Sequence, residues 1–204
     1  MSWNKKVRMD SLNQKVCGGE VDEAIIPVVE AINANPSYFT TSSCAGRIVL
    51  LRLPGLGDKE EAEFLAKWHR TVDMEDVKEA FLSIKEEGLT FLLAQSPIIH
   101  IRCKDVKSAV ELRNLAVESG FKYSTLKSLT LNSRDEPIKI VVEILSSENI
   151  HVPIARGSMI FPDDDYIGFI IENANSALKR ARDKLDRFRE NLAQISNSSM
   201  SLGK

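Results

Sequence analysis

The fold is decided by residues Asp73–Arg102, which read DMEDVKEAFLSIKEEGLTFLLAQSPIIHIR. Asp73 is a helix-capping residue type and stands directly before a helical pattern. The apolar face of that pattern is formed by Val77, Ala80, Phe81 and Ile84. Gly88 ends the segment, and two short apolar runs then predict strands over Thr90–Gln95 and Ile98–Arg102.

The same order recurs further along the chain. Asp105 precedes a second helical pattern, which Gly120 ends. Strands are predicted after it near Ser124–Leu131, Ile138–Leu145 and Ile150–Ile154. One interpretation of this recurrence is two related halves, each a helix followed by strands. The order of elements predicts an α+β fold, with a mixed β-sheet and helices packed against it, in a single domain over residues 1–196.

Three further elements precede this region. A helix is predicted over Val21–Asn33, and Pro27 should make its first half irregular because proline lacks a backbone donor. Arg47–Leu53 is rich in Ile, Val and Leu and predicts a strand. Asp58–His69 is interpreted as a charged helix whose inward-facing residues are Ala62, Leu65, Ala66 and Trp68.

The last helix gives the clearest periodic signal. Apolar residues from Ile167 to Ile195 alternate spacings of four and three, which is a heptad seam. Basic and acidic residues lie between these positions. One interpretation is a long helix packed on the body or on its twin in a homodimer, and the other is a basic face that touches RNA phosphates. The tail 197–204 is small and polar, and we expect it to be disordered.

Composition excludes several classes of protein. The 204 residues are 43% apolar and 27% charged, as in a globular protein rather than a disordered or membrane one. The N-terminus lacks the apolar run of a signal peptide, so we expect a cytoplasmic protein without a membrane span. Three cysteines argue against a disulfide framework and against a four-ligand zinc site. The net charge of −2 means that any RNA must bind a local patch.

Four hydroxyls and a thiol lie side by side in Tyr38–Arg47, which reads YFTTSSCAGR. Gly46 can adopt backbone conformations closed to other residues, and Arg47 can bind a carboxylate or phosphate with two nitrogens. A Ser/Thr-rich turn before a strand is the structural alternative. Cys44 as a nucleophile would need a neighbouring base, and none is adjacent in sequence.

Four other residues could take part in acid–base chemistry. His69 lies beside Trp68, and His100 lies within an apolar strand, where a histidine is more often a hydrogen-bonded core residue. Asp10 and Asp22 flank the first loop and are more often caps or surface groups. The sequence contains no P-loop, no Rossmann glycine fingerprint and no HExxH motif.

The run Tyr38–Ile48 resembles the signature of the tRNA wybutosine-synthesizing protein 3 family. Other segments fall in the order that this family shows, and the resemblance covers roughly residues 8 to 190. These segments are Gly19–Glu23, Trp68–His69, Ile99–Cys103, Glu118–Lys122, Val152–Ile154 and Asp165–Asn175.

The resemblance implies an enzyme that methylates a ring nitrogen, N-4, of the tricyclic wybutosine precursor. That base lies 3′ of the anticodon in phenylalanine tRNA, and S-adenosyl-L-methionine is the implied donor. A metal is not needed. Cofactor-binding residues would be Ser42, Ser43, Cys44, Gly46 and Arg47. Candidate catalytic residues would be Asp10, Asp22, His69 and His100, one of which would receive the proton or orient the nitrogen.

The chain departs from the family pattern at six positions, which are Gly18, Gln95, Ser96, Thr125, Leu145 and Glu148. Leucine and glutamate replace an arginine and a histidine of the family at the last two of these positions. Each lost cation would weaken a charge-assisted contact by about 1–3 kcal/mol. The alternative hypothesis is therefore a non-catalytic RNA-binding or oligomeric assembly protein that keeps the same fold.

Overall fold

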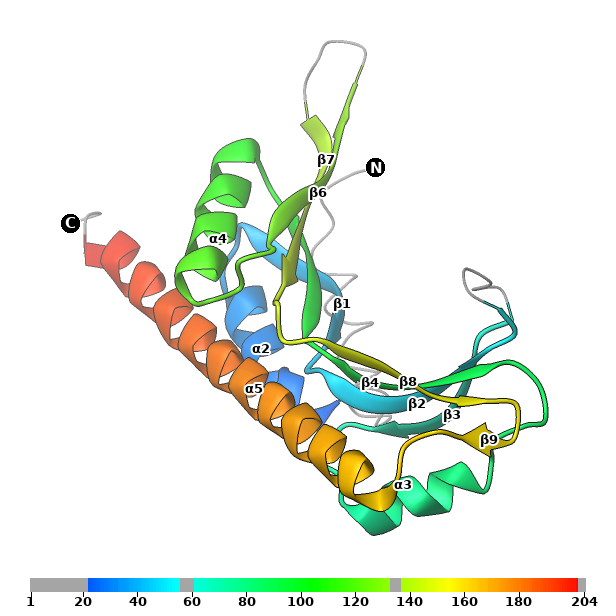
Figure 1. The fold of residues 1–204 in the computed structure, drawn as a ribbon. Coiled ribbons are helices and arrows are strands. Elements are labelled where there is room, and N and C mark those ends of the chain that lie inside the picture. Colours follow the sequence, from blue (N-terminus) through cyan, green and yellow to red (C-terminus); the bar gives the residue numbers. More distant parts are fainter. Residues whose placement is uncertain (1–21, 56–60, 133–136, 202–204) are drawn as a thin grey trace. The chain divides into compact units, whose positions relative to one another are not determined.

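A computed structural model of the chain describes residues 22–55, 61–132 and 137–201 (Figure 1). The chain forms two compact units. Unit 1 comprises residues 1–45, 97–147 and 182–204, and unit 2 comprises residues 46–96 and 148–181. Within the described segments, no helix is both long enough and apolar enough to cross a membrane.

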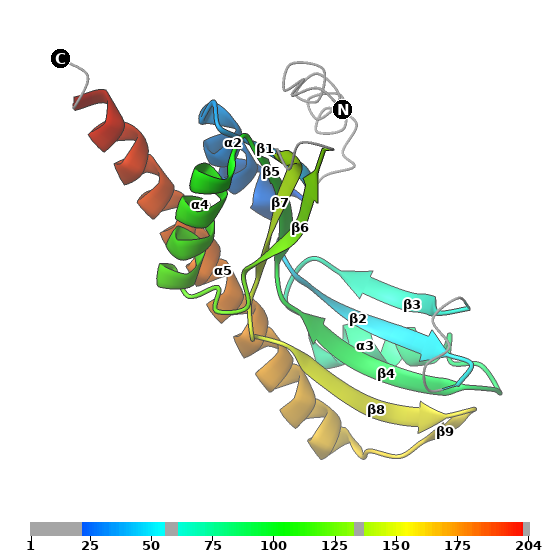
Figure 2. The ribbon, with the colours of Figure 1, turned by 90° about the horizontal axis from the view of Figure 1, so that it is seen from above.

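Unit 1 contains a four-stranded antiparallel sheet. Its strands, in their order across the sheet, are β1 (Tyr38–Cys44), β5 (Ile98–Cys103), β7 (Pro137–Leu145) and β6 (Thr125–Leu131). Its helices are η1 (Glu23–Ile25), α2 (Ile26–Ala34), α4 (Val106–Glu118) and the second part of α5 (Asp164–Ser201). These helices cover one face of the sheet, and the other face stays open among the described residues (Figures 1 and 2).

Strand periodicity explains why only one face of this sheet is covered. Side chains alternate between the two faces of a strand, so every second residue meets the helices. On β5, Ile99 and Ile101 are fully buried in the core, whereas His100 lies between them on the opposite face. Phe121 and Phe188 close the same core, with ring centroids 6.1 Å apart in an edge-to-face arrangement.

Unit 2 contains a five-stranded antiparallel sheet. Its strands, in order, are β3 (Glu63–Trp68), β2 (Arg47–Leu53), β4 (Leu89–Gln95), β8 (Ile150–Arg156) and β9 (Met159–Ile160). The helix α3 (Met74–Phe81) and the first part of α5 pack on one face (Figure 2). The buried seam of α5 there begins at Ile167, as the heptad spacing predicted.

The α+β class and the long C-terminal helix are confirmed. The strands divide between two sheets, and every pair among the described strands is antiparallel. The segments ending at Gly88 and Gly120 fall in different units, and both glycines have positive φ. The kinship of the two halves and the single-domain boundary stay predictions. Helix α5 continues to Ser201, into the segment for which we expected disorder.

The helix expected over Asp58–His69 is wrong. Glu63–Trp68 is instead the strand β3, and residues 56–60 lie outside the described segments. Ala66 pairs with Leu50, and Trp68 pairs with Ile48 of β2. Ala66 and Trp68 are two residues apart and fit one face of a strand, and pairing with a neighbouring strand overrode the weak helical preference.

The capping predictions are confirmed. Asp73 accepts a hydrogen bond from the Asp76 amide, and Asp105 accepts one from the Ser108 amide, in two capping boxes. Pro27 lies in the first turn of α2, directly after the short 3-10 helix η1, which is the irregularity expected there.

The Arg70–Asp76 pair gives a prediction for acid stability. The two guanidinium nitrogens of Arg70 donate to the two carboxylate oxygens of Asp76 at 2.6 and 2.7 Å. This bond lowers the pKa of Asp76 to about 2. Because the folded-state pKa lies below the unfolded one, the stabilisation is present above about pH 4 and is lost as the pH falls towards 2. We expect Asp76→Asn to lower the Tm by about 1–3 °C near neutral pH.

Thermal unfolding of both proteins from pH 7 down to pH 2 checks this expectation. The difference between wild type and Asp76→Asn should shrink as the pH falls below about 4. Glu75→Gln, in the same helical turn, is the control. A difference that stays constant down to the lowest pH would contradict the assignment.

Candidate active site

The open face of the unit 1 sheet carries a polar cluster centred on His100 of β5. A β-bulge lies in β1, where Thr40 pairs with Ile101 and Ser42 pairs with His100, so that Thr41 is an extra residue. The bulge turns two consecutive side chains, Thr41 and Ser42, towards His100. Ser42 Oγ lies 2.7 Å from His100 Nδ1, and Thr41 Oγ1 donates to the His100 carbonyl oxygen at 3.1 Å.

The other ring nitrogen of His100 meets a carboxylate. Glu143 lies directly opposite on β7, and its Oε2 is 2.5 Å from His100 Nε2. Lys127 Nζ donates to the same carboxylate oxygen and lies 2.9 Å from His100 Nε2. A second bulge, in β6, places Lys127 there, because Leu126 pairs with Val142 and Ser128 already pairs with Val141. The bulges in β1 and β6 therefore both direct side chains towards His100.

The contacts of this cluster allow two tautomers of the His100 ring. The Lys127 ammonium, bonded to Glu143, holds the pKa of that carboxyl below its usual range, and His100 adds to the effect. Lys127 and Glu143 balance one another. In the tautomer with Nε2–H, the ring donates to Glu143 and leaves the Nδ1 lone pair facing Ser42. In the other tautomer, Nε2 accepts from Lys127 and Nδ1–H donates to Ser42.

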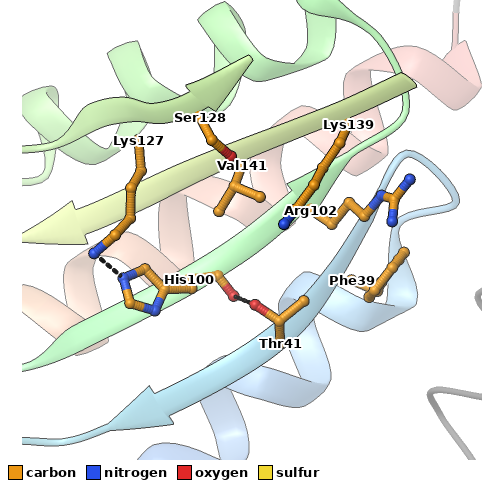
Figure 3. A pocket seen from close by; sticks show the side chains of 8 residues that line it. All are labelled: Phe39, Thr41, His100, Arg102, Lys127, Ser128, Lys139 and Val141. Atoms are coloured by element: carbon orange, nitrogen blue, oxygen red, sulfur yellow. Dashed lines mark hydrogen bonds between the residues drawn. The ribbon is translucent and has the colours of Figure 1, made fainter. Parts of the chain in front are cut away.

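The cluster borders a cavity of about 550 Å³ (Figure 3). Strands of unit 1 supply every lining side chain. The lining residues are Phe39, Thr41, His100, Arg102, Lys127, Ser128, Lys139 and Val141. His100 is 23% exposed and Glu143 is 16% exposed, so the acid–base pair is partly shielded but can be reached from solvent.

The structure places the other predicted residues of unit 1 as follows. Asp22 caps η1, and its carboxylate also accepts from the Ala45 amide at 3.3 Å. Ser43 and Cys44 are half-buried at the end of β1. Asp10 lies outside the described residues. Of the predicted residues described in this unit, Ser42 contacts His100, and a carboxylate oxygen of Asp22 lies within 4.8 Å of Cys44 Sγ.

Three predicted residues belong to unit 2. Gly46 has a φ of 87°, a conformation that favours glycine, directly before β2. Arg47 Nε donates to Gln95 Oε1 at 2.7 Å, and its guanidinium carbon lies 4.9 Å from the centre of the Phe64 ring. His69 is exposed just after β3. The hydrogen bond to Gln95 and the stacking on Phe64 together orient the guanidinium of Arg47.

Cys103 is excluded as a nucleophile by its surroundings. The side chain is buried in the unit 1 core, and burial raises the pKa of its thiol to about 12. A thiol with such a pKa is almost entirely protonated at neutral pH, and the thiolate is the reactive form.

Sequence reasoning missed Glu143 and Lys127. Glu143 is the one charged residue in the apolar run Ile140–Leu145, and alternation alone could have placed it opposite the core. Lys127 could not have been found in this way, because its position depends on a bulge that the sequence does not mark.

Comparison with known proteins identifies the family to which this chain belongs. A family model described as Methyltransferase TYW3 matches residues 4–194. The chain belongs to this family. The TYW3 resemblance read from Tyr38–Ile48 is thereby confirmed.

Curated relatives of this TYW3 member come from archaea. It is 40% identical over 191 residues to a Pyrococcus abyssi protein named tRNA(Phe) 7-((3-amino-3-carboxypropyl)-4-demethylwyosine(37)-N(4))-methyltransferase 1, covering 94% of this chain and 95% of that protein. It is 43% identical over 183 residues to the Pyrococcus horikoshii protein of the same name, covering 90% of each.

Solved structures show the same TYW3 fold. The PH1069 protein from Pyrococcus horikoshii superposes with a TM-score of 0.84 at 41% identity, covering 92% of this chain and 93% of that one. A hypothetical protein from Aeropyrum pernix gives a TM-score of 0.72 at 26% identity, covering 85% and 98%. The described fold is therefore shared across relatives of quite different sequence.

Proposed function

We propose that this chain is a tRNA methyltransferase that methylates N-4 of the wybutosine precursor 3′ of the anticodon in phenylalanine tRNA. The names of its relatives, which specify tRNA(Phe), position 37 and N(4), support the substrate. The structural observation that carries the proposal is the Ser42–His100–Glu143 arrangement, since methylation of an N–H nitrogen requires a group that takes the proton.

S-adenosyl-L-methionine would supply an activated methyl group when bound. Ser42, Ser43, Cys44, Gly46 and Arg47 are the residues we propose to hold it. Arg47 fits the donor's carboxylate, because Gln95 engages Nε, Phe64 covers the guanidinium face, and among the described residues neither contact uses the two terminal nitrogens that a two-pronged bond needs. Gly46, with its positive φ, allows a close approach to the backbone.

Side chains of unit 1 would accept the proton that the substrate nitrogen loses. His100 Nδ1 accepts the proton that the substrate nitrogen loses, with Ser42 Oγ as the relay between them. Glu143 stabilises the resulting imidazolium through its bond to Nε2, and Lys127 fixes the carboxylate in place. Asp22, Asp10 and His69 remain candidate polar partners. The anticodon loop is single-stranded, so little unpairing energy is needed to present the base.

A non-catalytic RNA-binding or assembly protein is not favoured. The relatives at about 40% identity are named methyltransferases, and the His100–Glu143 pair is intact despite the changes at Leu145 and Glu148. A homodimer through α5 and a cytoplasmic location remain part of the proposal. Sedimentation velocity of the full chain would reveal a dimer as a doubled mass.

Calorimetric titration of S-adenosyl-L-methionine into the purified protein tests the donor assignment. Arg47→Ala should weaken donor binding by about 10–100-fold, because a charge-assisted bond to the carboxylate is lost. Arg180→Ala is the matched control, since Arg180 lies on an exposed face of α5 and bonds to the neighbouring Ser176. Labelled methyl incorporated into precursor-bearing tRNA tests the reaction. Absence of both binding and incorporation by the wild type would refute the proposal.

A further inference from the structure

The cavity beside His100 has a second property that proton transfer does not explain, namely its positive charge. Three cationic side chains line it, Arg102 of β5, Lys127 of β6 and Lys139 of β7 (Figure 3). We infer that this cavity binds backbone phosphates of the RNA substrate next to the reacting base. The inference rests on the proposed function and adds to it the surface on which the RNA lies.

Strand geometry places these cations together. Ile140 and Val142 of β7 point into the core, so Lys139 and Val141 must project from the open face. Arg102 shares that face with His100, two residues before it on β5. The β6 bulge adds both Lys127 and Ser128 to the same side. Side chains from three adjacent strands thus surround one hollow.

Among the described residues, cationic side chains outnumber carboxylates at this cavity. Glu143 is the acidic group beside the cavity among the described residues, and its carboxylate is already bonded to Lys127 and His100. Lys139 is exposed, and no carboxylate of the described segments lies within ion-pair distance of it. An ammonium that points into a hollow and has no anionic partner among the described residues attracts an external anion.

The form of the cavity favours phosphodiesters over a single small anion. Its volume of about 550 Å³ lies in the range of sites that hold a nucleotide-sized group. Lysines on flexible stems suit phosphates as point charges, and the Ser128 hydroxyl adds a neutral donor of the kind that commonly contacts RNA backbone. The donor's carboxylate is already accounted for by Arg47 in unit 2.

Binding of precursor-bearing phenylalanine tRNA, measured by fluorescence anisotropy over a series of salt concentrations, tests the inference. Lys139→Ala should reduce the slope of log affinity against log salt by about one, and Lys139→Glu should weaken binding by about tenfold or more. The affinity for S-adenosyl-L-methionine should stay unchanged in both. Lys107→Ala and Lys107→Glu are matched controls, because Lys107 is 88% exposed on α4, away from the open face.

The inference would be overturned if Lys139→Glu bound tRNA with the affinity and salt dependence of the wild type. If the wild type also methylated tRNA, the proposed function would still stand. Loss of donor affinity with unchanged tRNA binding would assign the cavity to the donor and would also overturn it. Conversely, Lys139-dependent tRNA binding by a wild type without methyl transfer would support the surface while refuting the enzymatic proposal.

Discussion

His100→Ala is expected to lower the rate of methyl transfer by about 10²–10⁴-fold, the usual contribution of a positioned general base. The imidazole is held between Ser42 Oγ and Glu143 Oε2, so its removal takes away both the proton acceptor and the partner of the carboxylate. Single-turnover methylation of precursor-bearing tRNA, with enzyme and S-adenosyl-L-methionine in excess, isolates this step from product release.

Two further variants separate a catalytic effect from a structural one. Glu143→Gln keeps a hydrogen-bond acceptor but removes the charge, and we expect a smaller loss of rate than for His100→Ala. His151→Ala is the matched control, because His151 is exposed on β8 of unit 2, and it should react at the wild-type rate. A near-normal rate for His100→Ala, in a folded protein that binds tRNA, would remove His100 from the mechanism.

Phe121→Ala or Phe188→Ala is expected to reduce the free energy of unfolding by about 3–5 kcal/mol. Both side chains are fully buried, and their rings contact edge-to-face in the core of unit 1. Truncation removes buried apolar area and leaves a cavity that close-packed neighbours cannot fill. Urea unfolding followed by fluorescence and by circular dichroism measures the change.

Phe169→Ala provides the contrast. Phe169 is 60% exposed on α5 and stacks on Tyr166, so its loss should cost less than about 1 kcal/mol. If the exposed and the buried phenylalanines gave equal losses, the described core of unit 1 would be incorrect.

Local sequence signals predicted most of the elements. Asp73 and Asp105 begin their helices as expected, because a carboxylate that accepts from the first-turn amides acts within a few residues. Arg47–Leu53 forms its strand with the predicted bounds. β3 was missed because its apolar spacing fits two periods, and the choice was made by pairing with β2. The division into two sheets likewise depends on contacts between distant segments.

The candidate site was predictable to a lesser degree. The resemblance pointed to Ser42 and His100, which the structure brings into contact. Glu143 and Lys127 were not proposed, although both bond to His100. Both residues lie beside His100 because of how β5, β7 and β6 pair with one another. The sequence alone does not show which residues of neighbouring strands lie opposite each other.

The two extra residues, Thr41 and Lys127, also constrain how such a chain can change length. Deleting either one would leave regular alternation along the whole strand, because the remaining bulge residue still faces the open side and the residues beyond it keep their faces. Such a deletion would remove one polar side chain from beside His100 without exposing the core. A deletion at another position of β1 or β6 would turn the residues beyond it to the opposite face. Descendants of this gene should therefore tolerate single-codon losses at these two positions more readily than elsewhere in the two strands.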